Sequence, residues 1–316
     1  MARLGRSELD VFGLCLGGNV FGWTADESQS FEVLDAYAAS GGNFIDSSDS
    51  YSAFAPGNRG GESETVLGNW FASRGNRADI VLATKVGRKP DRPGLSRANI
   101  RTAVAESLER LQSDYIDLYY AHADDPDTPL EDTLRAFDEL VNEGTVKYIA
   151  ASNYSAPRLA QALEISDREG LARYVALQPH YSLVERHQYE GELAELCVGE
   201  GLACVPYWAL ARGFLTGKYR PGVQVDSPRA GAAAKYLEDD RAVAVLEALD
   251  RIAASRETTV PAVALAWVRA QPAVIAPIAS ARNPQQLGEI LPGATLELSK
   301  DELRELSDVS APVPTS

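Results

Sequence analysis

Four polar residues that could act together on a carbonyl group lie at or just beyond the ends of three apolar segments. Asp46 ends the first segment, and Tyr51 follows five residues later. Lys85 ends the second segment and His122 ends the third. If the segments are neighbouring parallel strands, their carboxyl ends meet at one face of the protein and the four side chains converge there.

These residue types suit the reduction of a carbonyl group. Hydride addition builds negative charge on the carbonyl oxygen, so a proton donor must stand beside it. A tyrosine with an ordinary pKa of ~10 becomes a better donor when a nearby ammonium favours its phenolate. This logic predicts Tyr51 as the acid, Lys85 as the group that lowers the pKa of Tyr51, and Asp46 as the anchor of Lys85. His122 would orient the carbonyl. Each residue alone has an ordinary structural explanation, so the prediction depends on clustering.

The composition limits the partners and the compartment. The 316 residues carry a net charge of −15, which argues against binding to nucleic acid. No apolar run approaches the ~20 residues needed to cross a bilayer, and no signal-peptide stretch follows Met1. Cys15, Cys197 and Cys204 lack metal-ligand spacing, so we expect core thiols, no metal site and a cytoplasmic location. The oligomeric state stays open.

Short apolar segments alternate with longer stretches of helical periodicity. Strands are expected to begin near Leu14, Asn43, Ile80, Tyr115, Thr145, Tyr174, Leu202 and Ala273. Eight such strand–helix units predict an α/β fold, a (β/α)8 TIM barrel that forms a single domain over residues 1–316. An open doubly wound sheet is the alternative, but residues 16–19 after the first strand do not form its glycine-rich dinucleotide motif.

Two additions to a bare barrel are expected. Residues 3–13 have a short pattern that predicts an N-terminal β-hairpin plugging the bottom of the barrel. About 70 residues separate the last two strand starts, and so long a connection is more often functional than idle. After a Gly- and Pro-rich stretch, that interval predicts extra helices near 240–255 and 261–270. Capping boxes are expected at 128–131 and at Ser299 with Glu302.

Segments spread over the whole chain resemble those of the aldo-keto reductase superfamily. They are residues 43–51, 61–64, 83–87, 120–122, 151–154, 177–179 and 206–218. The resemblance implies a (β/α)8 barrel that binds a nicotinamide cofactor without a Rossmann fold. It also implies hydride transfer from NADPH to an aldehyde or ketone. In this resemblance Asp46, Tyr51, Lys85 and His122 match the catalytic tetrad.

The resemblance also assigns contacts with the cofactor, to Ser152, Asn153, Gln178, Tyr207, Trp208, Leu210, Arg212, Lys218, Ser280, Arg282 and Gln286. The first three would hold or lie beside the carboxamide, and amide side chains do offer complementary donors and acceptors. Tyr207 would stack on the nicotinamide ring. The segment from Leu210 to Lys218 would lie along the pyrophosphate.

The segment from Ile278 to Gln286 resembles the family's adenosine-phosphate segment. Asn283 can cap a helix that begins at Pro284, and helix N-termini favour phosphate. The planar guanidinium of Arg282 suits a 2′-phosphate, so NADPH is favoured over NADH.

The match has departures. Ile290 stands where family members commonly carry Asn, and bulky Trp208 stands where a small Ser is common. Phe21, Trp23 and Phe54 are expected to line the substrate pocket, with core packing as the competing explanation for each.

Two other functions stay open. One is a regulatory module that binds the cofactor without significant turnover, because potassium-channel beta subunits resemble this family. The other is a barrel isomerase that uses Lys85 or His122 on a sugar phosphate. The native carbonyl substrate is not written in the sequence.

Overall fold

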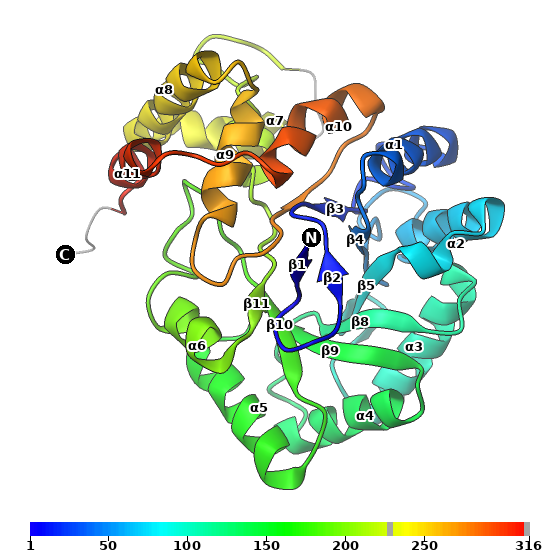
Figure 1. The fold of residues 1–316 in the computed structure, drawn as a ribbon. Helices are drawn as coiled ribbons and strands as arrows, with labels where there is room; N and C mark the ends of the chain where they lie inside the picture. The colour runs from blue at the N-terminus through cyan, green and yellow to red at the C-terminus, as the bar shows by residue number, and fades with distance from the viewer. Residues whose placement is uncertain (226–229, 313–316) are drawn as a thin grey trace.

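The centre of the molecule is a sheet of eight parallel strands (Figure 1). The computed structural model describes residues 1–225 and 230–312, so residues 226–229 of the Gly- and Pro-rich stretch lie outside the described residues. The hydrogen-bonded order is β11-β10-β9-β8-β5-β4-β3-β12. The strands are β3 (Cys15–Gly17), β4 (Phe44–Asp46), β5 (Val81–Val86), β8 (Ile116–Ala121), β9 (Val146–Ser152), β10 (Tyr174–Gln178), β11 (Ala203–Cys204) and β12 (Ile278–Ala279).

Backbone hydrogen bonds join the two ends of this sheet. Cys204 at the end of β11 forms a parallel bridge with Val274, and the N–H of Ile278 donates to the carbonyl of Pro206 at 2.9 Å. The sheet therefore curls into the predicted (β/α)8 barrel. The segment expected as a strand near residue 273 pairs with β11 at Val274, and the continuous strand β12 begins at Ile278.

Helices surround the barrel (Figure 1). The ring consists of α1 (Glu27–Ala39), α2 (Glu62–Arg74), α3 (Arg97–Leu111), α4 (Leu130–Asn142), α5 (Ala156–Glu169), α6 (Glu192–Glu200), α9 (Val260–Arg269) and α10 (Pro284–Ile290). Helices α8 (Asp240–Ser255) and α11 (Lys300–Val309) pack against each other outside the ring, and α7 (Ala230–Ala234) is a single short turn. Short 3-10 helices occur at η1 (Arg77–Asp79), η2 (Ala211–Thr216), η3 (Lys235–Glu238) and η4 (Leu291–Ala294). No helix in the described part of the chain is long and apolar enough to cross a membrane.

The helices expected near 240–255 and 261–270 are α8 and α9. Of these two helices, only α8 lies outside the ring. Eight of the ten residues of α9 are buried, because α9 occupies the ring position before β12 while α8 covers its outer side. The second outer helix is the C-terminal α11.

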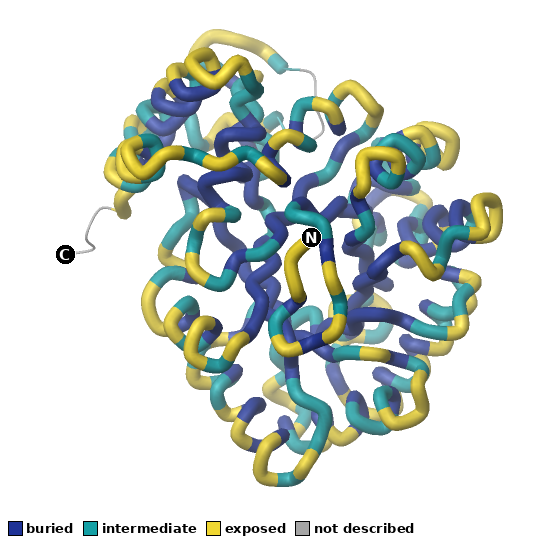
Figure 2. The backbone as a smooth tube through the Cα atoms, viewed as in Figure 1, coloured by how far each residue is buried: buried dark blue, intermediate teal, exposed yellow. Residues whose placement is uncertain are grey.

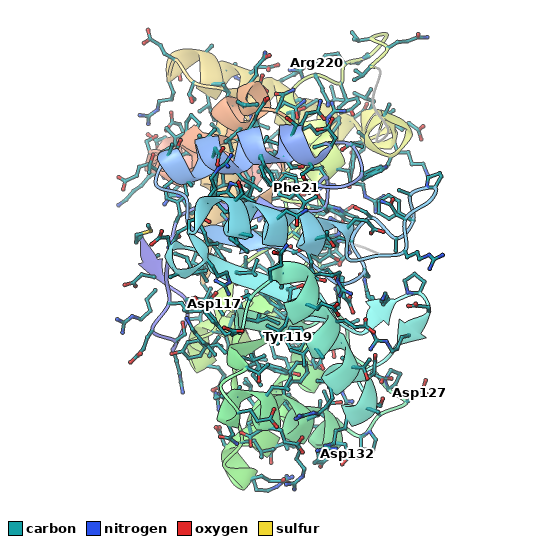
Figure 3. The ribbon with its side chains drawn as sticks, turned by 90° about the vertical axis from the view of Figure 1, so that its right-hand side faces the viewer. Phe21, Asp117, Tyr119, Asp127, Asp132 and Arg220 are labelled. Carbon is teal, nitrogen blue, oxygen red and sulfur yellow. The ribbon has the colours of Figure 1, made fainter. Side chains whose placement is uncertain are left out.

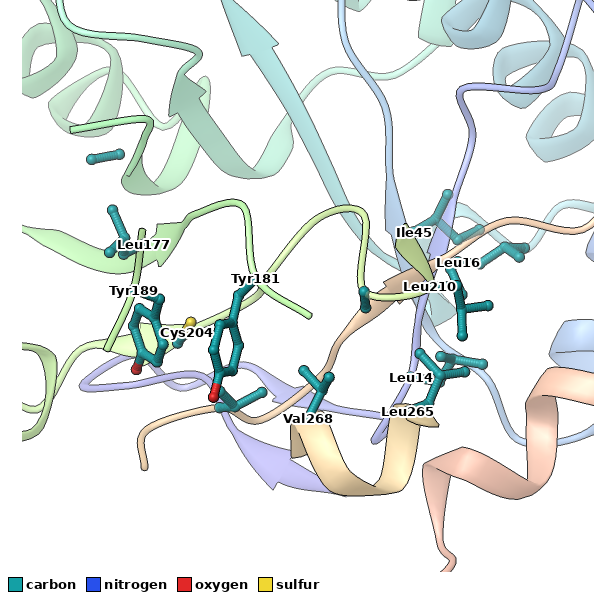
Figure 4. Close-up of a cluster of buried hydrophobic side chains, with 14 of the residues drawn as sticks. Leu14, Leu16, Ile45, Leu177, Tyr181, Tyr189, Cys204, Leu210, Leu265 and Val268 are labelled. Carbon is teal, nitrogen blue, oxygen red and sulfur yellow. The ribbon is translucent and has the colours of Figure 1, made fainter. Parts of the chain in front are cut away.

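Side chains alternate between the inside and the outside of the barrel, as they must along a strand. Phe44, Ala83 and Leu118 belong to an inner apolar cluster. Ile45 and Leu82, one residue along, belong to a larger cluster between the sheet and the helices. Figure 4 shows part of this outer cluster, and Figure 2 shows the buried strands inside an exposed periphery.

The predicted hairpin is present at the barrel's N-terminal end. β1 (Ala2–Arg3) pairs antiparallel with β2 (Asp10–Val11), and the hairpin lies across the middle of the barrel in Figure 1. Leu4 and Val11 are fully buried and join the inner apolar cluster. The hairpin therefore closes that end of the barrel.

One predicted capping box is confirmed and one is wrong. At α11 the Ser299 hydroxyl accepts from the N–H of Glu302 and the Glu302 carboxylate accepts from the N–H of Ser299. Helix α4 instead begins after Pro129 without a side-chain cap. The hydroxyl of Thr128 donates to Asp125 at 2.7 Å, so this loop carboxylate takes the group that would have capped the helix.

The close contact between α2 and α3 gives a test of the fold. A Cβ added at Gly68 in α2 would lie 2.1 Å from the carbonyl oxygen of Arg110 in α3. Alanine favours a helix over glycine by ~1 kcal/mol, yet we expect Gly68→Ala to lower the free energy of unfolding, because the backbone must move.

Gly199→Ala in α6 is the matched control for urea unfolding, since its Cβ would meet no atom within 4 Å. That variant should be as stable as the parent or up to about 1 kcal/mol more stable. A Gly68→Ala protein that gains as much stability as Gly199→Ala would contradict the packing of α2 on α3.

Candidate active site

The alternation of side chains brings the polar residues to one place. In β4 and β5 the inward positions end with Asp46 and Lys85, and the same alternation carries Ser152 in β9 and Gln178 in β10 into the barrel. His122 directly follows β8, and its N–H donates to the carbonyl of Val86 at 2.9 Å. All lie at the carboxyl ends of the strands, where barrel enzymes place their active sites.

Asp46, Lys85 and Tyr51 form one hydrogen-bonded group. Lys85 Nζ lies 2.6 Å and 2.7 Å from the two carboxylate oxygens of Asp46 and donates to the Ser47 carbonyl at 2.7 Å and to the phenolic oxygen of Tyr51 at 2.8 Å. Tyr51 in turn donates to Asp46 at 2.6 Å, and the amide of Gln178 donates to Asp46 at 2.9 Å. Lys85 and Asp46 are 0% and 1% exposed, so these bonds replace the water that both charges have lost.

The pKa of Tyr51 moves in the opposite direction from the prediction. Burial first, and then the negative charge of Asp46 and the hydrogen bond to it, raise the pKa of Tyr51 well above its ordinary value. Burial also lowers the pKa of Lys85, although Asp46 opposes that effect. The predicted lowering of the Tyr51 pKa is therefore wrong here, because burial and the negative charge of Asp46 both raise it. Tyr51 is a neutral phenol that retains its proton.

His122 stands beside Tyr51, with ring centroids 6.2 Å apart and planes at 76°. Burial, followed by the charges of Lys85 and Arg88, lowers the pKa of His122 well below its ordinary value, so the imidazole is neutral at physiological pH. Its Nδ1 lies 3.2 Å from the Ser48 hydroxyl and 3.5 Å from that of Ser50. Neither serine was singled out in the sequence, although both lie within the segment that contains Asp46 and Tyr51.

A cavity of about 690 Å³ opens above this group, within the usual size range of small-molecule sites. Tyr51 and His122 line the cavity, whereas Asp46 and Lys85 lie beneath it. All the residues expected to contact the cofactor also line it, namely Ser152, Asn153, Gln178, Tyr207, Trp208, Leu210, Arg212, Lys218, Ser280, Arg282 and Gln286.

The three aromatic residues expected at the substrate pocket divide into two groups. Trp23 and Phe54 line the cavity and contact each other edge to face, with centroids 4.8 Å apart, and Phe54 is 70% exposed. Phe21, labelled in Figure 3, is fully buried in the outer apolar cluster and does not line the cavity. For Phe21 the pocket prediction is wrong and core packing is the explanation.

Hydrogen bonds fix the side chains around Tyr207. Its hydroxyl donates to the amide oxygen of Asn153 at 2.8 Å, and the Asn153 amide nitrogen donates to the His122 carbonyl and to the Ser152 hydroxyl, each at 2.9 Å. His180, which the sequence analysis missed, stacks on Tyr207 with planes at 17°. This stacking supports one face of the Tyr207 ring while Tyr207 lines the cavity.

The cavity is rich in positive charge within an acidic protein. Its lining contains four cations and one carboxylate: Arg88, Arg212, Lys218, Arg282 and Glu289. Within residues 1–225 and 230–312, none of the four cations forms an ion pair, although the Arg212 guanidinium lies 3.8 Å from the centroid of the Trp208 ring. Unpaired cations facing a cavity favour an anionic ligand.

The segment from Ile278 to Gln286, expected to contact the adenosine phosphate, is ordered by its own side chains. Asn283 caps α10 by accepting from the N–H of Gln286 at 2.9 Å, as predicted. The side-chain oxygen of Gln286 accepts from the N–H of Arg282 at 3.0 Å, and Ser280 donates to Asn19 at 2.7 Å. Helix α10 has seven residues, so the Arg282 side chain rather than the helix dipole is the main source of positive charge here. The described residues contain no group of His, Cys, Asp or Glu that could hold a metal ion.

Asp49 is a buried carboxyl group that the Ser48 hydroxyl connects to His122. Ser48 donates to Asp49 at 3.3 Å, and Asp49 is 1% exposed. Burial, followed by the charge of Glu64, raises the pKa of Asp49 from 3.8 to about 7. The folded protein therefore holds this proton more tightly than the unfolded chain does. The resulting stability is fully present below pH 3.8 and is lost as the pH rises towards 7.

We therefore expect Asp49→Asn to gain stability relative to the parent as the pH rises from 5 to 8, because the amide cannot ionise. The gain between pH 5 and pH 8 is at most about 3 kcal/mol, because only the interval from pH 5 to about 7 contributes. Urea unfolding at pH 5 and pH 8 measures it. Asp91→Asn, at an exposed position, is the control. Its free energy of unfolding should differ from that of the parent by the same amount at pH 5 and at pH 8. A difference that is independent of pH for Asp49→Asn would contradict a neutral buried carboxyl.

The chain is similar over nearly its whole length to known proteins. Residues 13–311 match the model of the aldo/keto reductase family. The chain is 34% identical to Protein tas of Escherichia coli (strain K12), over 97% of this chain and 96% of that protein. It is 32% identical to norsolorinic acid reductase of Aspergillus flavus, over 94% and 77%. It is 33% identical to a probable voltage-gated potassium channel subunit beta of Oryza sativa subsp. japonica, over 91% and 88%. The chain therefore belongs to the aldo/keto reductase family of oxidoreductases.

Proposed function

We propose that this protein reduces the carbonyl group of a small aldehyde or ketone with hydride from NADPH. The observation that carries the proposal is the neutral phenol of Tyr51, held 2.8 Å from buried Lys85 and facing a cavity beside neutral His122. Membership of an oxidoreductase family supports a nicotinamide cofactor.

The lining residues fit NADPH in charge and in shape. Tyr207 would hold the nicotinamide ring on the face that His180 leaves to the cavity. The amide oxygen of Asn153 accepts from Tyr207 and has a second lone pair for the carboxamide. Arg212 and Lys218 would bind the pyrophosphate, and Arg282 the 2′-phosphate. Bound NADPH supplies the hydride.

Tyr51 and His122 would hold the carbonyl oxygen. Tyr51 exchanges its hydrogen bond to Asp46 for one to that oxygen and donates its proton as negative charge develops there. Lys85, 2.8 Å away, then stabilises the phenolate, and Asp46 keeps Lys85 in place. His122 can donate through Nε2 when Ser50, or Ser48 turned from Asp49, donates to Nδ1.

The proposed location is the reducing cytoplasm. Cys15, Cys197 and Cys204 are free and buried, and burial raises the pKa of each thiol above its ordinary value. Such thiols are inert and are typical of reducing compartments. The proposed partner is a small carbonyl compound rather than a macromolecule.

A regulatory module that binds the cofactor without turnover is the second candidate. The similarity to a potassium channel subunit beta favours it. The hydrogen bonds that join Tyr51, Lys85 and Asp46 favour turnover. NADPH consumption with a panel of aldehydes and ketones decides between them: turnover of any member supports the reductase, and tight NADPH binding with no turnover supports the module.

Tyr51→Phe should lower kcat at least 100-fold, because general acids contribute about 10²–10⁴ to rates. NADPH binding, measured by fluorescence titration, should stay near the parent value because only a hydroxyl is removed. Tyr148→Phe is a control at the opposite end of the barrel, where the hydroxyl accepts from the N–H of Glu8. Parent-like turnover in Tyr51→Phe would exclude Tyr51 as the acid.

Arg282→Ala should weaken NADPH binding roughly 10- to 100-fold, which corresponds to charge-assisted hydrogen bonds of about 1.5–3 kcal/mol. The affinity for NADH, which lacks the 2′-phosphate, should fall far less. Dissociation constants for both cofactors measure the contrast, with Arg304→Ala in α11 as a remote control. Equal losses for both cofactors would refute the 2′-phosphate role.

A further inference from the structure

Arg88 is a cavity cation that the sequence analysis did not single out. It lies in a short hairpin of β6 (Arg88–Lys89) and β7 (Arg92–Pro93), which follows β5 at the carboxyl end of the barrel. Val86, two residues before Arg88, accepts the backbone hydrogen bond of His122. The side chain of Arg88 lines the same cavity as Tyr51 and His122.

The other cations of this hairpin have partners, but Arg88 does not. Lys89 lies 3.5 Å and Arg92 lies 2.5 Å from the carboxylate of Glu106. The guanidinium of Arg88 forms neither a hydrogen bond nor an ion pair with any residue in the ranges 1–225 and 230–312. Arg88 is exposed and lines the cavity, so its unpaired guanidinium is available to a ligand.

Arg88 and the cations assigned to the cofactor follow different strands of the barrel. Arg212 and Lys218 follow β11, and Arg282 follows β12, and these two strands adjoin where the barrel closes. Arg88 follows β5, which β4 and β3 separate from β12 on one side and β8, β9 and β10 separate from β11 on the other. Arg88 therefore comes from a different part of the barrel rim than the three cations assigned to the phosphates of the cofactor.

The surroundings of Arg88 indicate what else its ligand contains. Trp23, Phe54 and Trp208 line the cavity and offer aromatic surface. Phe54 is 70% exposed, so part of this surface is open to an incoming molecule. The planar fork of a guanidinium matches the two oxygens of a carboxylate.

We propose that Arg88 binds a carboxylate of the substrate, so that the preferred substrates are aromatic or apolar aldehydes and ketones that carry a carboxylate. This inference rests on the proposed carbonyl reduction, in which Tyr51 and His122 hold the carbonyl oxygen. The carboxylate would then lie on the β5 side of the cavity.

The test compares matched pairs of substrates with NADPH. The 2-, 3- and 4-carboxybenzaldehydes are each paired with their methyl esters, since the three isomers place the carboxylate at different distances from the carbonyl. The parent should prefer at least one acid over its ester in kcat/KM by roughly 10-fold or more. In Arg88→Gln that preference should fall roughly 10- to 100-fold.

Lys89→Gln is the matched control, because it removes a neighbouring cation that is paired with Glu106 and does not line the cavity. Its preference for the acid should equal that of the parent. A parent without any preference for an acid, or a preference that survives in Arg88→Gln, would overturn the proposal.

Calorimetric binding of the same carboxybenzaldehydes, with NADP+ present, separates this inference from the proposed function. Binding that weakens in Arg88→Gln but not in Lys89→Gln supports the carboxylate site even if the parent turns over no carbonyl compound. Turnover of the esters without any role of Arg88 in acid binding would leave the reductase standing and remove the carboxylate site.

Discussion

The ion pair between Lys85 and Asp46 is the interaction on which the rest of the site depends. Two fully buried charges are stable only when every remaining hydrogen-bonding position around them is filled. The partners come from distant parts of the chain, because Tyr51 follows β4 and Gln178 ends β10. The amide of Gln178 reaches Asp46 because the barrel curls β10 round towards β4. The closed barrel is therefore a condition for the ion pair, and the ion pair holds the phenol in place.

The site is consequently built in two layers. The charged groups lie below, out of contact with the cavity, whereas the neutral phenol and the neutral imidazole line the cavity. Burial keeps the proton on Tyr51 and keeps it off His122. A ligand thus meets two neutral hydrogen-bonding groups at one end of the cavity and unpaired cations elsewhere. This division suits a molecule whose reacting group is uncharged and whose binding groups are anionic.

Much of this arrangement could be predicted, because side chains along a strand point alternately into and out of the barrel. Asp46, Lys85 and His122 stand at strand ends, so their convergence requires only parallel neighbours. The pKa of Tyr51 could not be predicted, because its direction depends on how completely the folded chain excludes water. Phe21 and Trp23 are equally apolar in the sequence, and only the path of their loop decides which one faces the cavity. Arg88 resembles an ordinary solvated residue until its neighbours are seen to have other partners.

The hairpin formed by the first eleven residues has a kinetic consequence. Leu4 and Val11 fill the lower end of the barrel, so ligands reach Tyr51 from the rim at the opposite end. If two molecules share that opening and one sits deeper, the deeper one must enter first and leave last. A plug far from the reacting atoms would in this way impose an obligatory order on binding and release.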